Sequence, residues 1–117
     1  MVRNSGFVEF VLDMLSPLGG VAERRMFGGC GLFRDGVMFA IVADDALYFK
    51  TDEANQADFE AAGSAPFVYR RRGRRIAMSY HEVPPDVMDD PEVLSAWARK
   101  ALDVALHAKR PARRGKS

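Results

Sequence analysis

Arginine is the residue type in this chain with the clearest capacity to recognise another molecule. Six consecutive positions, 70 to 75, contain five arginines around one glycine. The guanidinium group is planar and donates paired hydrogen bonds to phosphates and carboxylates. We therefore take five side chains as candidate contacts for a polyanion or a protein partner: Arg70, Arg71, Arg72, Arg74 and Arg75.

A second basic group lies in residues 109–117, where no acidic side chain is present. Like charges repel one another and this segment has little to bury, so we expect a disordered basic tail. It follows a single domain that we place at residues 1–108. The tail adds five candidate contacts: Lys109, Arg110, Arg113, Arg114 and Lys116.

The arginine-rich stretch has a second interpretation. Residues 1–108 contain 12 basic and 16 acidic side chains, although the whole chain has a net charge of +1. An acidic body can supply carboxylates to the arginines, and charge runs usually face solvent. We favour a solvated hairpin tip of this kind. Contact with nucleic acid through the hairpin and the tail remains the alternative.

Other residues begin ligand-binding motifs without completing them. Gly28, Gly29 and Gly31 surround Cys30, but neither Gly-Lys-Ser/Thr nor a predicted helix follows, as a phosphate loop requires. Glycine within a strand more often marks a bulge or a close backbone approach. A cysteine in a strand is more often a small buried side chain than a reactive thiol.

The residues around His81 are equally incomplete as a catalytic or metal site. His81 and Glu82 begin a His-Glu-x-x-His zinc motif, but Pro85 stands where the second histidine belongs. Ser79 shares a face of the predicted strand with His81, with Tyr80 and Glu82 on the other face, and no orienting acid or oxyanion donor is evident. We therefore expect no catalytic residue, no metal and no cofactor, and predict that the chain is not an enzyme.

Composition limits where such a chain works. Cys30 is the only cysteine, which excludes an intrachain disulfide and is typical of a reducing compartment. Glu9 and Asp13 interrupt the first apolar segment, unlike the core of a signal peptide. No stretch reaches the ~18 apolar residues of a membrane span. These features predict a cytoplasmic protein.

The first half of the chain predicts one helix followed by a meander of strands. Apolar residues at helical spacing predict a helix over about 5–17, which Pro17 and two glycines end. Asp35-Gly36 favours the positive φ angles of a tight hairpin turn, and Asp44-Asp45 is expected to form the next turn. Short runs of β-branched and aromatic residues predict four strands, at about 22–27, 30–34, 37–43 and 46–51.

The second half predicts a helix, a hairpin and a final helix. Helix-forming residues span 53–62, and two strands at 67–70 and 74–83 turn at Arg72-Gly73. Pro84-Pro85 ends the last strand, and a helix from Pro91 to about His107 follows. The expected fold is α+β and two-layered, with an antiparallel sheet of about six strands, helices on one face, and the order α-β-β-β-β-α-β-β-α.

Several of these segments together resemble the N-terminal domain of the TfoX (Sxy) competence regulators. The resemblance covers about residues 5–106, in order and with compatible spacing. It rests on Phe59 with Gly63, on the helix that carries Trp97, and on five runs of sequence: RMFGGCGLF at 25–33, DGVMF at 35–39, LYFK at 47–50, PFVY at 66–69 and MSYHEVP at 78–84.

The resemblance implies a regulatory function and no known chemistry. Full-length members are bacterial regulators that promote transcription of DNA-uptake genes together with the cyclic-AMP receptor protein, and they carry a second, C-terminal domain. We expect this chain to be a stand-alone version of the N-terminal domain. Its expected function is that of a non-enzymatic regulatory module that binds a protein partner, through its sheet face or a strand edge, with a homodimer among the alternatives.

Overall fold

The computed structural model describes residues 5–26 and 29–109, and it shows an α+β fold with one antiparallel sheet. Four helices are present in this part of the chain: α1 (Ser5–Met14), α2 (Gln56–Ala61), α3 (Pro85–Met88) and α4 (Pro91–Lys109). Six strands join in the order β1-β2-β3-β4-β6-β5: β1 (Ala22–Met26), β2 (Gly29–Arg34), β3 (Val37–Ala43), β4 (Ala46–Lys50), β5 (Pro66–Arg71) and β6 (Arg74–Glu82).

Three hairpins in the sheet turn through two residues that both have positive φ. These φ values are 53° and 78° at Asp35-Gly36, 52° and 60° at Asp44-Asp45, and 53° and 77° at Arg72-Gly73. Paired positive φ angles define the type I′ turn, whose twist matches that of the flanking strands. The three turns predicted from sequence are therefore confirmed.

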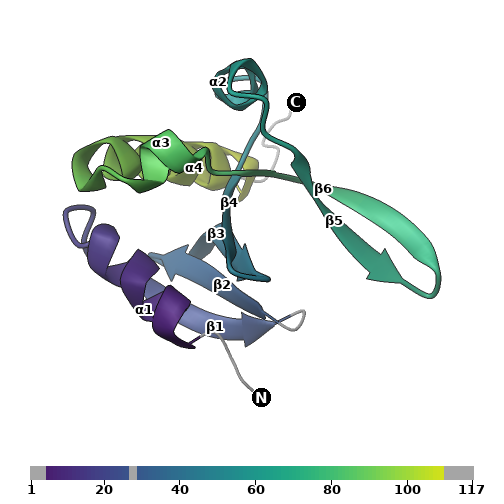
Figure 1. Ribbon diagram of the computed structural model, residues 1–117, viewed down its shortest axis with the longest axis horizontal. Helices are drawn as coiled ribbons and strands as arrows, with labels where there is room; N and C mark the ends of the chain where they lie inside the picture. The colour runs from purple at the N-terminus through teal and green to yellow at the C-terminus, as the bar shows by residue number, and fades with distance from the viewer. Residues whose placement is uncertain (1–4, 27–28, 110–117) are drawn as a thin grey trace.

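The helices cover one face of the sheet, as predicted (Figure 1). α1 and α4 each bury an apolar stripe against the strands, and both stripes belong to one core. A bulge in β3 lets two consecutive residues of this strand face the core. Leu32 pairs with Ala40 and Phe33 pairs with Met38, so Phe39 is an extra residue in β3. Phe39 and Ala40 are both fully buried in the core beneath the helices.

The structure corrects the predicted ends of two helices. The first helix ends at Met14 rather than at residue 17. Its last turns tighten, because Ser16 N–H bonds the carbonyl of Asp13, and Pro17 has no N–H to continue the ladder. The second helix begins at Gln56 rather than at residue 53 because Asp52 forms a turn of its own, accepting a bond from the N–H of Ala54 on Oδ1.

A short helix, α3, was not predicted. Pro85 begins it, at a position where the missing N–H of proline leaves no bond unmade. Its Val87 side chain is buried in the core. The two prolines were read only as the end of a strand, and the single turn of helix after them contains too few residues to show periodicity.

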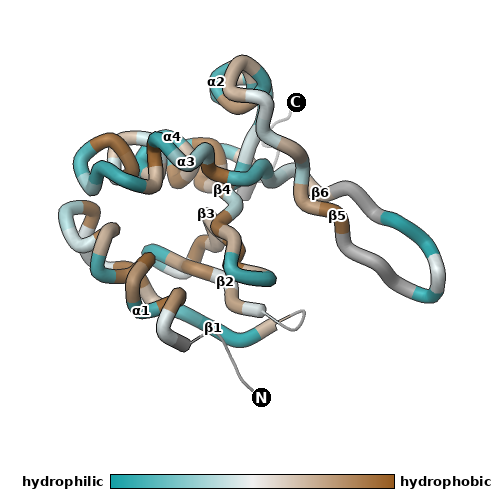
Figure 2. Tube along the Cα trace, in the orientation of Figure 1, coloured by the Kyte–Doolittle hydropathy of each residue, from teal (hydrophilic) through white to brown (hydrophobic). Residues whose placement is uncertain are grey.

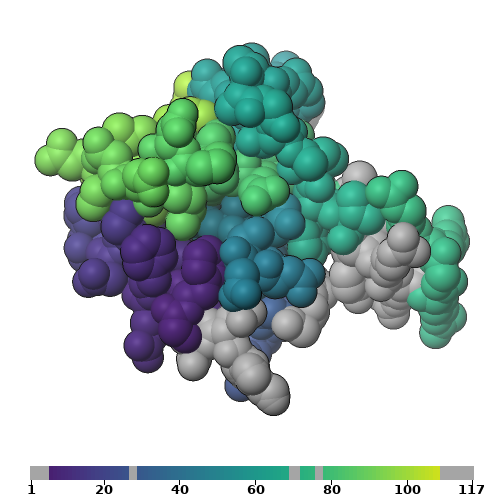
Figure 3. All heavy atoms as spheres, viewed as in Figure 1, coloured from purple at the N-terminus to yellow at the C-terminus, as the bar shows by residue number. Residues whose placement is uncertain are grey.

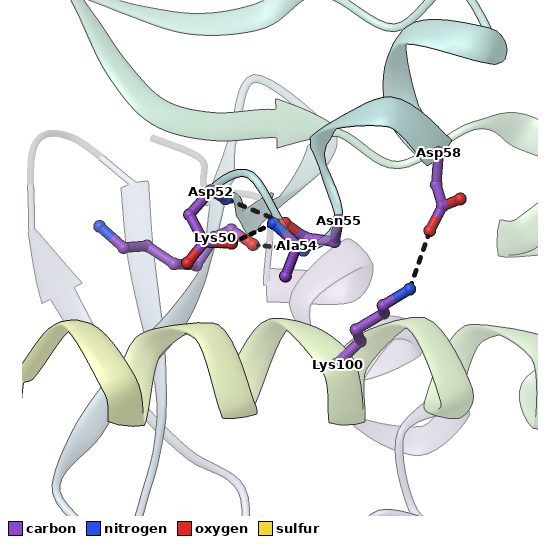
Figure 4. A network of polar contacts seen from close by, with 6 residues as sticks. All are labelled: Lys50, Asp52, Ala54, Asn55, Asp58 and Lys100. Carbon is purple, nitrogen blue, oxygen red and sulfur yellow. Dashed lines mark hydrogen bonds and ion pairs between the residues drawn. The ribbon is translucent and has the colours of Figure 1, made fainter.

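Asn55 links the start of α2 to the end of β4 by a side-chain hydrogen bond (Figure 4). Its Nδ2 donates to the carbonyl of Lys50 at 2.9 Å, and its Oδ1 accepts from the N–H of Asp52 at 2.9 Å. The side chain is 1% exposed. Farther along α2, Asp58 meets Lys100 of α4 at 3.3 Å, an ion pair exposed to solvent. The buried amide is therefore the stronger tie.

We expect Asn55→Ala to lower the free energy of unfolding by about 2 kcal/mol, because a buried carbonyl and N–H lose their partners. Urea unfolding followed by circular dichroism measures the change. Gln56→Ala is the matched control: its side chain bonds only Glu60, in solvent, and its loss should change stability by less than about 0.5 kcal/mol. Equal effects of the two substitutions would contradict this account of Asn55.

Candidate contact surfaces

The β5–β6 hairpin extends beyond the sheet as a two-stranded arm. β4 pairs with β6 at Tyr80, His81 and Glu82, and the bond from Thr51 N–H to the Ser79 carbonyl continues this ladder. From residue 74 to 77, β6 pairs among the described strands with β5 alone. We call residues 68–77 the β5–β6 arm. In Figures 1 and 3 it projects from the body on the right.

The tip of the arm carries the predicted arginines. The backbone pairs are Arg70 with Arg75 and Arg71 with Arg74, on either side of the turn at Arg72. Arg72, Arg74 and Arg75 are exposed. The side chains of Arg70 and Arg71 lie outside the described part of the structure. Figure 2 shows the hydrophilic tip at the end of the arm.

The favoured interpretation was a solvated tip whose arginines pair with carboxylates of the body, and the described arginines are exposed but show no such pairing. None of Arg72, Arg74 and Arg75 has a described carboxylate within ion-pair distance. Arg72 also occupies a turn position that favours Asn, Asp or Gly. A non-glycine residue at positive φ costs of order 1 kcal/mol. The turn therefore does not explain why arginine stands there.

The structure describes one residue of the predicted basic tail. Lys109 is the last residue of α4, and its side chain is not described. Four of the candidate contacts lie outside the described residues: Arg110, Arg113, Arg114 and Lys116. The structure thus brings together the five arginine positions of the arm and does not place the tail against them.

A second candidate surface lies on the sheet face that no described helix covers, which we call the helix-free face. An apolar cluster separate from the main core lies here. Tyr48 and Phe67 meet edge to face, with ring centroids 4.9 Å apart. Three members are buried, namely Ile41, Phe67 and Tyr80. Four are half-buried, namely Met38, Ala43, Tyr48 and Met78.

Carboxylates border one end of the helix-free face. Tyr48 pairs with Glu82 across the β4–β6 ladder, and Asp44 lies in the turn that precedes β4. Burial raises the pKa of Tyr48, and the negative charges of Glu82 and Asp44 raise it further, since both oppose the phenolate. No described cation lies within ion-pair distance of either carboxylate.

The motif residues adopt the structural roles expected of them. An added Cβ on Gly29 would collide with the carbonyl of Val42, and one on Gly31 would lie 2.7 Å from the sulfur of Met38. Close backbone approach explains Gly29, as predicted, whereas side chains crowd Gly31; Gly28 lies outside the described residues. Cys30 is buried in the core, as predicted.

His81 is also part of the packing, as the strand alternation predicted. It is 8% exposed, its Nδ1 lies 3.0 Å from Thr51 Oγ1, and its ring packs against Phe59. Tyr80 and Glu82 lie on the opposite, helix-free face. Ser79 is exposed and lies in the same strand. In the described part of the chain, no three His, Cys, Asp or Glu side chains are grouped to hold a metal ion.

Two further features complete the surface. A hollow of about 180 Å³ opens between α2 and α4, lined by Asn55, Asp58, Phe59, Ala96, Trp97 and Lys100.

Within the described ranges, no helix is both long enough and apolar enough to cross a bilayer.

A sheet face free of helices was predicted from sequence, but the residues that form it were not identified. The available signal was alternation: Met78, Tyr80 and Glu82 repeat every second residue, as do Ile41 and Ala43 in β3. Alternation assigns residues to a face but does not say which face the helices cover. Fully apolar strands such as β3 also hide which of their two faces is the core.

Tyr80 provides a test of how tightly the helix-free face is packed. Burial raises its pKa from 10.0 to about 12. Because the folded pKa exceeds the unfolded one, this contribution to stability is complete below pH 10 and is lost as the pH rises from 10 to about 12. Ultraviolet titration should show a late phenol at about pH 12 that is absent in Tyr80→Phe and retained in Tyr48→Phe, in addition to the raised pKa of Tyr48 in the wild type. Three phenols titrating together near 10.0 in the folded protein would contradict the packing.

Comparison with known proteins identifies the family. The chain matches the model of the TfoX N-terminal domain over residues 13–105. It is 28% identical over 102 residues to DNA transformation protein TfoX1 of Aliivibrio fischeri (strain ATCC 700601 / ES114), covering 87% of this chain and 49% of that protein. It is 27% identical over 97 residues to Protein Sxy of Escherichia coli (strain K12), covering 83% and 46%. The chain thus spans about half the length of these curated relatives, and it belongs to the TfoX N-terminal domain family.

Proposed function

We propose that this chain is a non-catalytic regulatory module that binds another protein through its helix-free face. One observation carries the proposal: half-buried Met38, Tyr48 and Met78 lie together on a sheet face without a described helix above it. Aromatic residues and methionine are enriched where proteins meet, and arginine is enriched with them. Exposed arginines adjoin this face on the β5–β6 arm.

The names of the relatives suggest the process in which the module acts. The relative from A. fischeri is named a DNA transformation protein. We propose that the protein contact made by this chain regulates DNA uptake. The chain corresponds to about half of each relative, so this proposal concerns the contact that the shared half makes.

The proposal is tested by capturing proteins from a nuclease-treated extract of the native host. Tagged wild type should retain at least one protein, and Met78→Lys should reduce the retained amount at least tenfold, because a charge would be buried at the contact. Leu106→Lys is the matched control, since Leu106 is a 40% exposed apolar residue on α4. Circular dichroism checks that each variant is folded.

Two results would contradict the proposed contact. One is that tagged wild type retains no protein, an untagged copy of this chain included, above the level of an untagged control. The other is that Met78→Lys and Leu106→Lys retain the same amount as wild type. Equal retention would mean that the helix-free face takes no part in binding.

A second function, association with nucleic acid, is favoured by the exposed arginines of the arm. If five phosphates are neutralised on duplex DNA, the logarithm of the binding constant should fall with the logarithm of salt concentration with a slope of about −4.5. Arg72→Asn keeps the turn, which favours Asn, and should reduce the slope by about 0.9. A chain that ends at residue 108 separates the arm from the tail. Absence of binding at low salt, or binding indifferent to salt, would contradict this function.

A further inference from the structure

A basic, an apolar and an acidic side chain follow one another along β6 on the helix-free face. Arg74 near the tip, Met78 in the middle and Glu82 at the base are four residues apart. Side chains alternate between faces along a strand, and the register shift opposite Phe67 adds two residues to β6, so residues separated by an even number still share a face. Met78 and Tyr80 belong to the apolar cluster of the helix-free face, which places Arg74 and Glu82 on that face too.

The charges at the two ends of this row cannot neutralise each other within one molecule. Eight residues of extended strand, at about 3.3 Å per residue, separate Arg74 from Glu82 by about 26 Å. Both side chains are exposed, and neither has an oppositely charged partner among the described side chains. Lys50, the cation nearest along β4, lies over the Tyr80 ring, 5.2 Å from its centroid.

The acidic end is reinforced from outside β6. Asp44 lies at the turn before β4, and its charge, like that of Glu82, acts on Tyr48. The helix-free face therefore has a basic end on the arm, a middle that is apolar apart from Lys50 over the Tyr80 ring, and an acidic end with two carboxylates. The acidic end would repel a nucleic acid, and a bound nucleic acid would leave the apolar middle exposed to water. An apolar partner with its own opposite charges fits all three zones.

We propose that a second copy of this chain occupies the helix-free face, related to the first by a two-fold axis that passes near Met78. Met78 is midway between Arg74 and Glu82. Rotation about such an axis brings Arg74 of each copy against Glu82 of the other, and the apolar zones against each other. A two-fold interface must be complementary to itself in this way. The inference rests on the proposed function and names the partner that the contact surface binds.

The arm gives the second copy a structural role as well. An isolated two-stranded hairpin is at best marginally stable in water. In this protein the arm extends beyond the strand that supports its base. Packing against a second copy would cover the helix-free side of the arm and leave the side that bears Arg75 in solvent.

Sedimentation equilibrium on the full chain, over a range of protein and salt concentrations, tests the inference. Wild type should be a dimer of twice the 13.0 kDa chain mass, and salt should weaken it. Arg74→Glu and Glu82→Arg should each raise the dissociation constant at least tenfold. Arg75→Glu is the matched control: it makes the same charge change one residue away, on the other side of the arm, and should leave the constant within twofold of wild type.

The double variant Arg74→Glu with Glu82→Arg should dimerise again, because the exchanged charges pair across the axis. It should not associate with wild type, since like charges would then meet. Circular dichroism and urea unfolding of every variant show that it is folded. Rescue by the exchange distinguishes a direct contact from a general effect of charge.

Three results would overturn the inference: a monomer at every concentration, equal weakening by Arg74→Glu and Arg75→Glu, or no rescue by the double variant. These outcomes are distinguishable from failure of the proposed function. A monomeric wild type that still captures another protein, in a manner sensitive to Met78→Lys, would overturn the dimer and leave the protein contact standing. A monomer that captures nothing would remove both.

Discussion

The short ladder between β4 and β6 is the interaction on which the remaining architecture depends. It pairs three residues on each strand and joins the four-stranded meander to the β5–β6 arm. On the helix side of this ladder, His81 contacts Thr51 and Phe59, so the packing of α2 holds the junction. On the other side, Tyr48, Tyr80 and Phe67 meet. A single junction thus determines both where the arm points and what the helix-free face contains.

The one-sided layering of the helices gives the sheet two different surfaces. Buried strand residues and the bulge at Phe39 serve the helix side, which forms the main core. The helix-free face has a smaller apolar cluster whose outer members stay half-exposed. Under the proposed function, the stability of the domain and the contact with a partner are separated onto opposite faces of the sheet.

Sequence reasoning succeeded where local chemistry determines structure. Asp35-Gly36 and Arg72-Gly73 were recognised as turns because few residues tolerate positive φ, and α4 was recognised because its apolar stripe spans many turns. It was less successful for α3 and for the start of α2. There the outcome depends on a single helical turn at Pro85 and on the side-chain bonds of Asp52 and Asn55.

The sequence by itself determined the order of the elements other than α3, and the three turns, because turn chemistry and periodicity act between residues close together in the chain. It also placed Tyr80 and Glu82 on one side of a strand and Ser79 and His81 on the other, since alternation is local. Only the tertiary structure decided which side the helices cover, that Arg72, Arg74 and Arg75 have no described carboxylate within ion-pair distance, and that Asp44 joins Glu82 near Tyr48. These facts depend on how strands distant in sequence pair, and strand pairing is decided by the packing of the whole domain.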